Sequence, residues 1–185
     1  MLYTKKGDDG MTKLFDCVER LSKGAKAIEA LGTLDELNAI LGWCKLEASG
    51  ANFVLAGEGD WSLGDVMSNL QQDLFILQAQ LAGADKQMTV ERVAWLEEVI
   101  ARAEKDLPTI NSFIVSGGTR VSALLDVART IARRAERRLV ETREEGKATV
   151  EDTMVSYLNR LSSTLYALAR FVNAKAGIEE EKPHY

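Results

Sequence analysis

The sequence predicts an all-α protein, a single five-helix bundle preceded by a long N-terminal loop. Apolar residues recur at spacings of three and four in five separate stretches, which is typical of helices that bury one face. The 185-residue chain has only two prolines, so little in it interrupts a helix. No stretch shows a sustained strand pattern. We therefore expect one domain, with a loop over residues 1–28, the bundle over 29–176 and a tail over 177–185.

The first two helices follow from capping signals and leucine spacing. Thr33 followed by Glu36 matches a capping box, which predicts a helix from about Thr33 to Ala48. Residues 49–63 break the pattern and are expected to form a loop. The second helix is predicted at about 64–83. The leucines that define its buried face are Leu70, Leu74, Leu77 and Leu81.

The other three helices are bounded by residues that cap or end helices. Thr89 is a candidate N-cap, and the third helix is expected to end before Pro108 because the residue preceding a proline disfavours helical dihedral angles. The fourth helix is predicted at 120–145 and stops at Gly146, a typical C-terminal signal. The fifth is predicted at 149–176, where apolar residues alternate at spacings of four and three, as in helical bundles.

Composition excludes several classes of function. A net charge of −5 and a pI of about 5.1 argue against a general nucleic-acid binder. One histidine, His184, makes a histidine-based metal site or triad improbable, and Cys17 and Cys44 are too few for a disulfide framework or zinc site. No apolar run is long enough to span a membrane. We expect a cytoplasmic protein with no membrane or nucleic-acid partner.

The fourth helix carries an arginine cluster, with six arginines in residues 128–145. At about 100° per residue the cluster divides into two flanks of the apolar stripe. One flank holds Arg129, Arg133, Glu136 and Arg137. The other holds Arg134 and Arg138. Two interpretations stay open: a solvated helix face, or a site for an anion, because arginine binds anionic groups through two parallel hydrogen bonds.

Four further motifs are weak signals when each is taken alone. Residues 4–12, TKKGDDGMT, could turn backbone N–H groups toward an anion, but they match no Walker A pattern and could equally be flexible. Residues 32–38, GTLDELN, place acids in the expected first helical turn, where the helix dipole favours them. Residues 113–119, FIVSGGT, turn into the arginine helix, and 157–162, YLNRLS, place Asn159 beside the core, where a purely structural role is common.

Taken in order, the motifs TKxGDxGxT, GTLDELN, LP…F…GGT, ARTxxRRAER and YLNRLS resemble the PduO-type ATP:cob(I)alamin adenosyltransferases, from about Tyr3 to Asn173. The resemblance implies a homotrimer of five-helix bundles with active sites between neighbouring subunits. It implies transfer of the 5′-deoxyadenosyl group of ATP to the cobalt of cob(I)alamin, which gives adenosylcobalamin and triphosphate. A Mg²⁺ ion on the phosphates would be held largely by the nucleotide and water, with no metal ligands from the protein.

The resemblance also implies roles for individual residues. The N-terminal loop would bind ATP through Thr4, Lys5, Lys6, Gly7, Thr12 and Lys13, with a phosphate contact from Lys23. The helices would complete the nucleotide site through Arg133, Arg134, Glu136, Arg137 and Asn159. Asp35 of one subunit would pair with Arg129 of the next, and Phe113 would lie against the corrinoid and help displace its lower ligand. Arg133, Phe113, Asp35 and Arg129 are therefore the candidate catalytic residues.

The chain departs from the family pattern at four positions. Ser116 stands where a proline is usual, Asp126 where a histidine is usual, Ser163 where an aspartate is usual and Ala27 where an arginine is usual. The changes at Ser116, Asp126 and Ser163 keep one alternative open, a non-catalytic ATP- or corrinoid-binding relative that acts as a sensor or cofactor carrier. A third interpretation is a structural bundle that binds no nucleotide. For an active enzyme, a reductase and an adenosylcobalamin-dependent enzyme are the expected protein partners.

Overall fold

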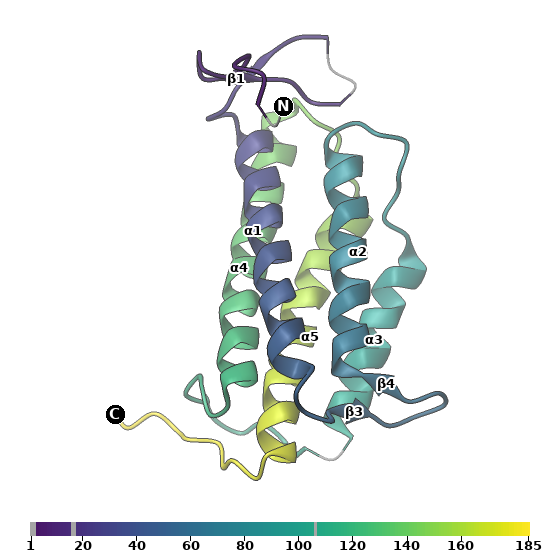
Figure 1. Cartoon of the computed structure of the whole chain (residues 1–185), viewed down its shortest axis with the longest axis vertical. Coiled ribbons are helices and arrows are strands. Elements are labelled where there is room, and N and C mark those ends of the chain that lie inside the picture. Colours follow the sequence, from purple (N-terminus) through teal and green to yellow (C-terminus); the bar gives the residue numbers. More distant parts are fainter. Residues whose placement is uncertain (1–2, 16–17, 106) are drawn as a thin grey trace.

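Five long helices run along roughly one direction in the computed structural model, which confirms the predicted all-α bundle (Figure 1). The structure describes residues 3–15, 18–105 and 107–185, so the expectation for Cys17 lies outside the described residues. The helices are α1 (Lys26–Ala48), α2 (Leu63–Leu81), α3 (Val90–Glu104), α4 (Arg120–Glu145) and α5 (Asp152–Lys175). Two short antiparallel pairs join them: β1 (Met11–Thr12) with β2 (Leu21–Ser22), and β3 (Val54–Leu55) with β4 (Trp61–Ser62).

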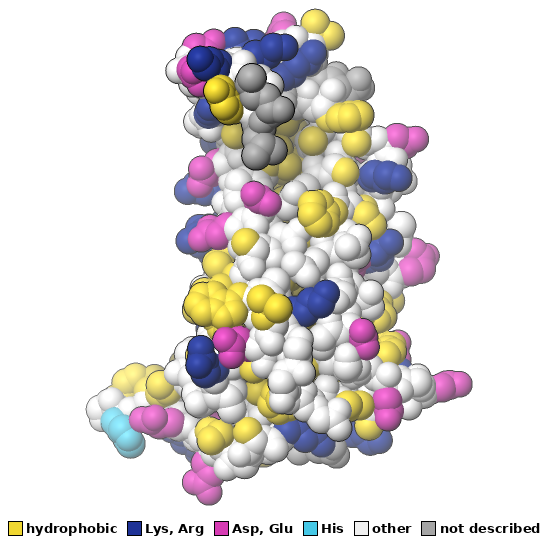
Figure 2. Space-filling model, viewed as in Figure 1, with side chains coloured by type: hydrophobic (Ala, Val, Ile, Leu, Met, Phe, Trp, Pro, Cys, Tyr) yellow, Lys and Arg dark blue, Asp and Glu magenta, His cyan; other side chains and the backbone are white. Residues whose placement is uncertain are grey.

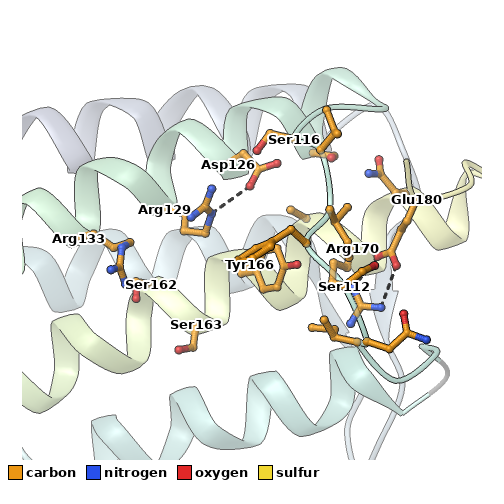
Figure 3. Close-up of a pocket in the computed structure, with 18 residues that line it drawn as sticks. Ser112, Ser116, Asp126, Arg129, Arg133, Ser162, Ser163, Tyr166, Arg170 and Glu180 are labelled. Atoms are coloured by element: carbon orange, nitrogen blue, oxygen red, sulfur yellow. Dashed lines mark hydrogen bonds and ion pairs between the residues drawn. The ribbon is translucent and has the colours of Figure 1, made fainter. Parts of the chain in front are cut away.

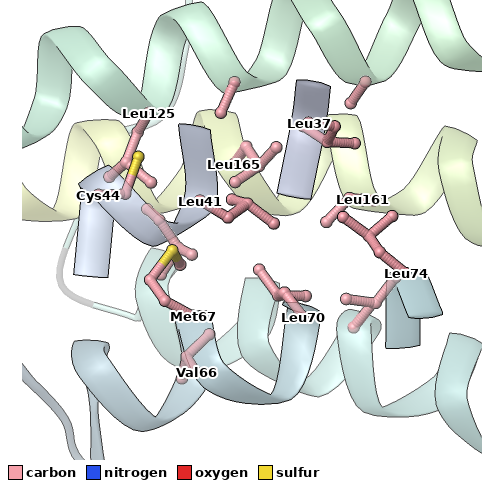
Figure 4. Close-up of a cluster of buried hydrophobic side chains, with 14 of the residues drawn as sticks. Leu37, Leu41, Cys44, Val66, Met67, Leu70, Leu74, Leu125, Leu161 and Leu165 are labelled. Atoms are coloured by element: carbon pink, nitrogen blue, oxygen red, sulfur yellow. The ribbon is translucent and has the colours of Figure 1, made fainter. Parts of the chain in front are cut away.

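The core lies where the apolar faces of the helices meet. Helix α1 packs against α2 and α4, and α5 packs against α3 and α4. Leucines from α1, α2 and α5 meet at the centre of the bundle (Figure 4). Leu41, Leu70 and Leu165 are fully buried there, and each buried leucine stabilises the fold by about 2 kcal/mol. The spacing of three and four residues was therefore a sound guide to the buried face of each helix.

The expected start of the first helix is wrong. Helix α1 begins at Lys26, and its N-cap residue Ala25 makes no side-chain capping bond. The Thr33 hydroxyl instead donates to the Glu29 carbonyl oxygen at 2.8 Å, inside the helix. Residues 26–31, KAIEAL, are strong helix formers, so the helix extends past the apparent capping box. Asp35 consequently lies well inside the helix and not in its first turn.

Two other local expectations need correction. Residues 49–63 are not simply a loop, since they contain the β3–β4 hairpin. Arg102 of α3 anchors this hairpin: its guanidinium carbon lies 3.6 Å from the centroid of the Trp61 ring, and its Nη1 donates to the Gly59 carbonyl at 2.8 Å. Thr89 does occupy the N-cap of α3, but its side chain makes no capping hydrogen bond. The predicted stop at Gly146 is confirmed, because this residue has the left-handed φ of 72° that favours glycine.

A buried polar cluster connects α2, α3 and α5. Tyr157 donates its hydroxyl to Asp73 Oδ2 at 3.0 Å, and Arg92 forms an ion pair with the other carboxylate oxygen. Burial raises the pKa of Asp73 above its ordinary value, although Arg92 and the Tyr157 hydroxyl oppose that shift. Burial also raises the pKa of Tyr157 well above its ordinary range. In the described part of the chain, none of the helices combines the length and apolar character needed to cross a membrane.

Candidate functional site

A pocket of about 730 Å³ lies between α4, α5 and the segment that connects α3 to α4 (Figure 3). Helix α4 contributes one polar side chain per turn at a spacing of three or four residues, which places them on one face. Helix α5 contributes the facing wall through small side chains, Tyr166, Arg170 and Asn173. The polar residues that line the pocket from the two helices include Ser122, Asp126, Arg129, Arg133, Ser162, Ser163 and Tyr166.

Positive charge on α4 faces the pocket. Arg129 Nε donates to Asp126 Oδ1 at 3.0 Å, and its guanidinium carbon lies 5.7 Å from the centroid of the Tyr166 ring. Arg133 lies one turn further along α4 and also lines the pocket. Partial burial raises the pKa of Tyr166 above its ordinary value, so its hydroxyl stays protonated near neutral pH. This wall can therefore hold an anionic group through Arg133 while Arg129 is oriented by Asp126.

The opposite edge of the pocket is apolar and exposed. Phe113 is 79% exposed, and Ile110 and Val115 in the same segment are also exposed. Large apolar side chains of this kind are normally buried, so three in one short segment indicate a surface suited to an apolar ligand. Cationic groups on one side and apolar groups on the other could hold a ligand with both kinds of surface.

The N-terminal loop is held in a defined shape by Arg20, which lies outside all the sequence motifs described above. Its guanidinium donates to Asp9 Oδ2 at 2.7 Å and to the carbonyl oxygens of Lys6 and Met11. The bond to Arg20 lowers the pKa of Asp9. Lys23 Nζ donates to the Gly7 carbonyl at 2.7 Å, so this lysine lies over the loop. Figure 2 shows Lys and Arg side chains gathered at this end of the bundle, with acidic side chains among them.

The arginines of α4 divide into two flanks, as the helix angles predict. Arg134 pairs with Glu36 of α1, and Arg138 pairs with Glu29 of α1 at 3.6 Å. On the other flank, Glu136 accepts a hydrogen bond from Asn159 Nδ2 of α5 at 3.0 Å. Arg137, on this same flank, donates to the backbone carbonyl of Arg133.

Not all candidate residues meet within one chain. The N-terminal loop holds the expected nucleotide contacts Thr4, Lys5, Lys6, Gly7, Thr12 and Lys13. In the described ranges its hydrogen bonds stay within residues 3–29 or reach the end of α2, where Phe15 N–H donates to the Ala82 carbonyl. Asp35 is exposed on α1, and Arg129 pairs within its own chain to Asp126. The pair expected between Asp35 and Arg129 of two subunits therefore stays a prediction.

Comparison with known proteins shows one consistent family. The family model for cobalamin adenosyltransferase matches residues 2–172. The corrinoid adenosyltransferase of Bacillus subtilis is 38% identical over 96% of this chain and 89% of its own length. The corrinoid adenosyltransferase PduO of Salmonella typhimurium is 39% identical over 95% of this chain, which spans only 50% of that longer protein.

Solved structures give the same result. A variant PduO-type ATP:corrinoid adenosyltransferase from Lactobacillus reuteri, complexed with cobalamin and ATP, superposes with a TM-score of 0.85. It is 29% identical, and the match covers 100% of this chain and 97% of that one. A second variant of the same description, complexed with ATP, has a TM-score of 0.83 and is 28% identical, with 99% of this chain and 100% of that one covered.

Proposed function

The chain belongs to the cobalamin adenosyltransferase family, and from this premise we propose that it transfers the 5′-deoxyadenosyl group of ATP to the cobalt of cob(I)alamin. The products are adenosylcobalamin and triphosphate. The observation that carries the proposal is the pocket between α4 and α5, which is lined by Arg129 and Arg133 on one side and by the exposed Phe113 on the other. Cationic side chains suit a polyphosphate, and an exposed aromatic ring suits the apolar surface of a corrinoid.

The reaction needs little proton chemistry from the protein. The electron pair of cobalt(I) attacks C5′ of ATP, a Co–C bond forms, and the bond from C5′ to the triphosphate oxygen breaks with both electrons leaving on triphosphate. No proton has to be moved in this step. The protein must instead bring C5′ and cobalt together and stabilise the charge of the leaving triphosphate.

We assign the nucleotide to the N-terminal loop and the arginine helix. Thr4, Lys5, Lys6, Gly7, Thr12 and Lys13 would surround the phosphates together with Lys23, and Arg20 supports this assignment because it holds the loop in shape. From the helices, Arg133, Glu136, Arg137 and Asn159 share one flank and would complete the site. Arg134 lies on the other flank and is engaged by Glu36, so its contribution is expected to be smaller.

We assign the corrinoid to the apolar side of the pocket. Phe113 would lie against the corrin ring and exclude the lower axial ligand, since its ring has few contacts of its own and is free to pack on a ligand. Asp35 of a neighbouring subunit would pair with Arg129, which places the site between subunits of a homotrimer. We also propose a cytoplasmic location, with a reductase and an adenosylcobalamin-dependent enzyme as protein partners.

A Mg²⁺ ion would be bound mainly through the triphosphate. Within the described residues, no group of three or more Asp, Glu, His or Cys side chains lies close enough to hold a metal ion. The ion would reach the site with the nucleotide and keep water in its coordination shell, as Mg²⁺ commonly does. No step proposed for the protein's own residues depends on it.

The test combines turnover with substitution at the pocket. The protein is incubated with ATP, Mg²⁺ and chemically reduced cob(I)alamin, and the corrinoid spectrum and triphosphate release are followed together. We expect a Co–C product and one triphosphate for each product. Phe113→Ala should lower the rate by at least about tenfold, whereas Val127→Ala, an exposed apolar control on α4 outside the pocket, should not. A wild-type protein that binds ATP but forms no product would contradict the proposal.

A further inference from the structure

The segment that carries Phe113 has little packing of its own. It borders the pocket described above and also a second hollow of about 360 Å³, and Ile110, Ser112 and Ile114 line both. The segment thus has open space on two sides. The polar bonds that it makes with the rest of the chain therefore help to fix its position.

Arg170 of α5 makes the first of these bonds. Its side chain is only 5% exposed, although arginine is rarely buried without a partner. Nη2 donates to the Pro108 carbonyl at 2.8 Å, at the start of the segment. Nε and Nη2 also bind both carboxylate oxygens of Glu180, at 2.5 Å and 3.0 Å. One guanidinium thus joins the Phe113 segment to the C-terminal tail, and Figure 3 shows its pair with Glu180.

The tail in turn bonds the middle of the segment. The Val115 N–H donates to the Glu181 carbonyl at 2.8 Å, one residue beyond the ion pair. Because Glu180 holds the tail against α5, it also holds that carbonyl in place. Phe113 therefore lies between two attachment points: Pro108, which Arg170 bonds directly, and Val115, which bonds the tail that Glu180 holds against α5.

The far end of the segment is fixed independently. Asn173, one turn beyond Arg170 on α5, donates from Nδ2 to the Gly117 carbonyl at 2.7 Å and accepts the Thr119 N–H at 3.1 Å. Gly118 has a φ of 107° and packs directly on this amide. Loss of the Arg170–Glu180 pair should therefore loosen the Phe113 region and leave the start of α4 in place.

We propose that Arg170 and Glu180 are positioning residues that hold Phe113 at the pocket for the corrinoid half of the reaction. The inference rests on the proposed function for its kinetic consequence. Arg170 and Glu180 also line the pocket, but the role proposed for them acts on Phe113 through Pro108 and Val115. The N-terminal loop lies at the other end of the bundle, beside the start of α1, so nucleotide binding there should be nearly unaffected (Figure 1).

The test compares two carboxylates of the tail. Glu180→Gln removes the ion pair, and Glu179→Gln makes the same charge change at an exposed neighbour outside that pair. We expect Glu180→Gln to lower kcat/KM for cob(I)alamin by about tenfold while KM for ATP changes by less than about twofold. Glu179→Gln should match the wild type. Arg170→Lys, which keeps the charge but cannot bind both partners in the same fork, should fall in between.

A second readout does not require activity. Hydrogen exchange of the peptide around Val115 should be faster in Glu180→Gln than in Glu179→Gln, with α4 unchanged. Equal exchange and equal kinetics in the two variants would overturn the inference, as would a parallel loss in the ATP and cob(I)alamin parameters. An inactive wild type would refute the proposed function instead, and the exchange comparison would still decide whether the ion pair holds the segment.

Discussion

Replacing Arg92 by methionine should destabilise the fold, because it leaves the buried carboxylate of Asp73 without its paired cation. The Asp73 side chain is 4% exposed, and Arg92 is the cation paired with it. Removing one partner of a fully buried pair costs about 3–5 kcal/mol. Here Arg92 is itself 39% exposed and Tyr157 still donates to the carboxylate, so we expect a smaller loss, about 2 kcal/mol of unfolding free energy.

The loss should depend on pH in a defined direction. Burial raises the folded-state pKa of Asp73 above the ordinary value, so the folded chain binds this proton more tightly than the unfolded chain does. The group therefore destabilises the fold at pH values above its folded pKa, and that cost is relieved as the pH falls toward the unfolded pKa. Without Arg92 the pKa of Asp73 rises further, so the cost of Arg92→Met should be smaller at pH 5 than at pH 7.

Urea unfolding at the two pH values measures this prediction, and two variants control it. Arg160→Met removes the cation of an exposed pair with Glu97 and should cost less than about 1 kcal/mol at either pH. Measured in an Asp73→Asn background, which lacks the titrating group, the cost of Arg92→Met should not vary with pH. An equal cost for Arg92→Met at both pH values would refute the reasoning.

Two further predictions concern the turn before α4 and the arginine flanks. Gly118→Ala should lower the free energy of unfolding by about 3 kcal/mol in a urea titration, and Gly146→Ala by about 1 kcal/mol. Both glycines have positive φ, but only a Cβ on Gly118 would lie 2.5 Å from a side-chain amide. Similar losses for the two variants would contradict the close packing at Gly118. Arg133→Ala should weaken ATP binding by about tenfold or more in calorimetry, whereas Arg134→Ala, whose guanidinium pairs with α1, should weaken it less; the reverse order would contradict the assignment of flanks.

Apolar periodicity predicted all five helices, because burial on one face is the main force that positions each of them. The start of α1 was wrong for a local reason: Thr33 and Glu36 have the spacing of a cap, but a cap stabilises a helix start by only about 1 kcal/mol. The helix formers of residues 26–31 and the continued burial of Ala27 and Ala30 outweigh it. Capping motifs therefore locate a helix start only where the residues before them cannot form helix.

The site was less predictable than the fold. Helix angles alone placed Arg133 and Arg134 on different flanks of α4, because both residues lie on one regular helix. Arg20 pairs with Asp9, 11 residues away, and Arg170 pairs with Glu180, 10 residues away. Both partners lie in irregular segments, and no periodic pattern in the sequence predicts their positions. A signal for Arg170 did exist, since it interrupts the apolar run LYALARFV at a position that faces the core. A lone charge inside a buried stripe predicts a specific partner, although it does not say which.

The positions of the N-terminal loop and of the pocket beside Phe113, the two parts of the proposed site, bear on the predicted homotrimer. Helices α1 and α4 are antiparallel, with Glu29 paired to Arg138 at one end and Glu47 to Arg120 at the other. The N-terminal loop precedes the first pair, and Phe113 precedes the second, so within one chain they lie at least about 27 Å apart along the helix axis. The reaction requires C5′ of ATP and cobalt to come into bonding contact, which a loop and a pocket from different subunits would allow.

Mixing two defective variants tests this arrangement. Lys6→Ala would impair the loop, and Phe113→Ala would impair the pocket. If the loop and the pocket of a site come from different chains, mixed trimers contain intact sites, and about a quarter of the wild-type activity should return after joint refolding. If each site belongs to one chain, every site carries one defect and no activity returns. Recovery of activity therefore supports a site shared between subunits. A lack of recovery refutes that arrangement, but it leaves the roles assigned to the N-terminal loop and to the pocket unchanged.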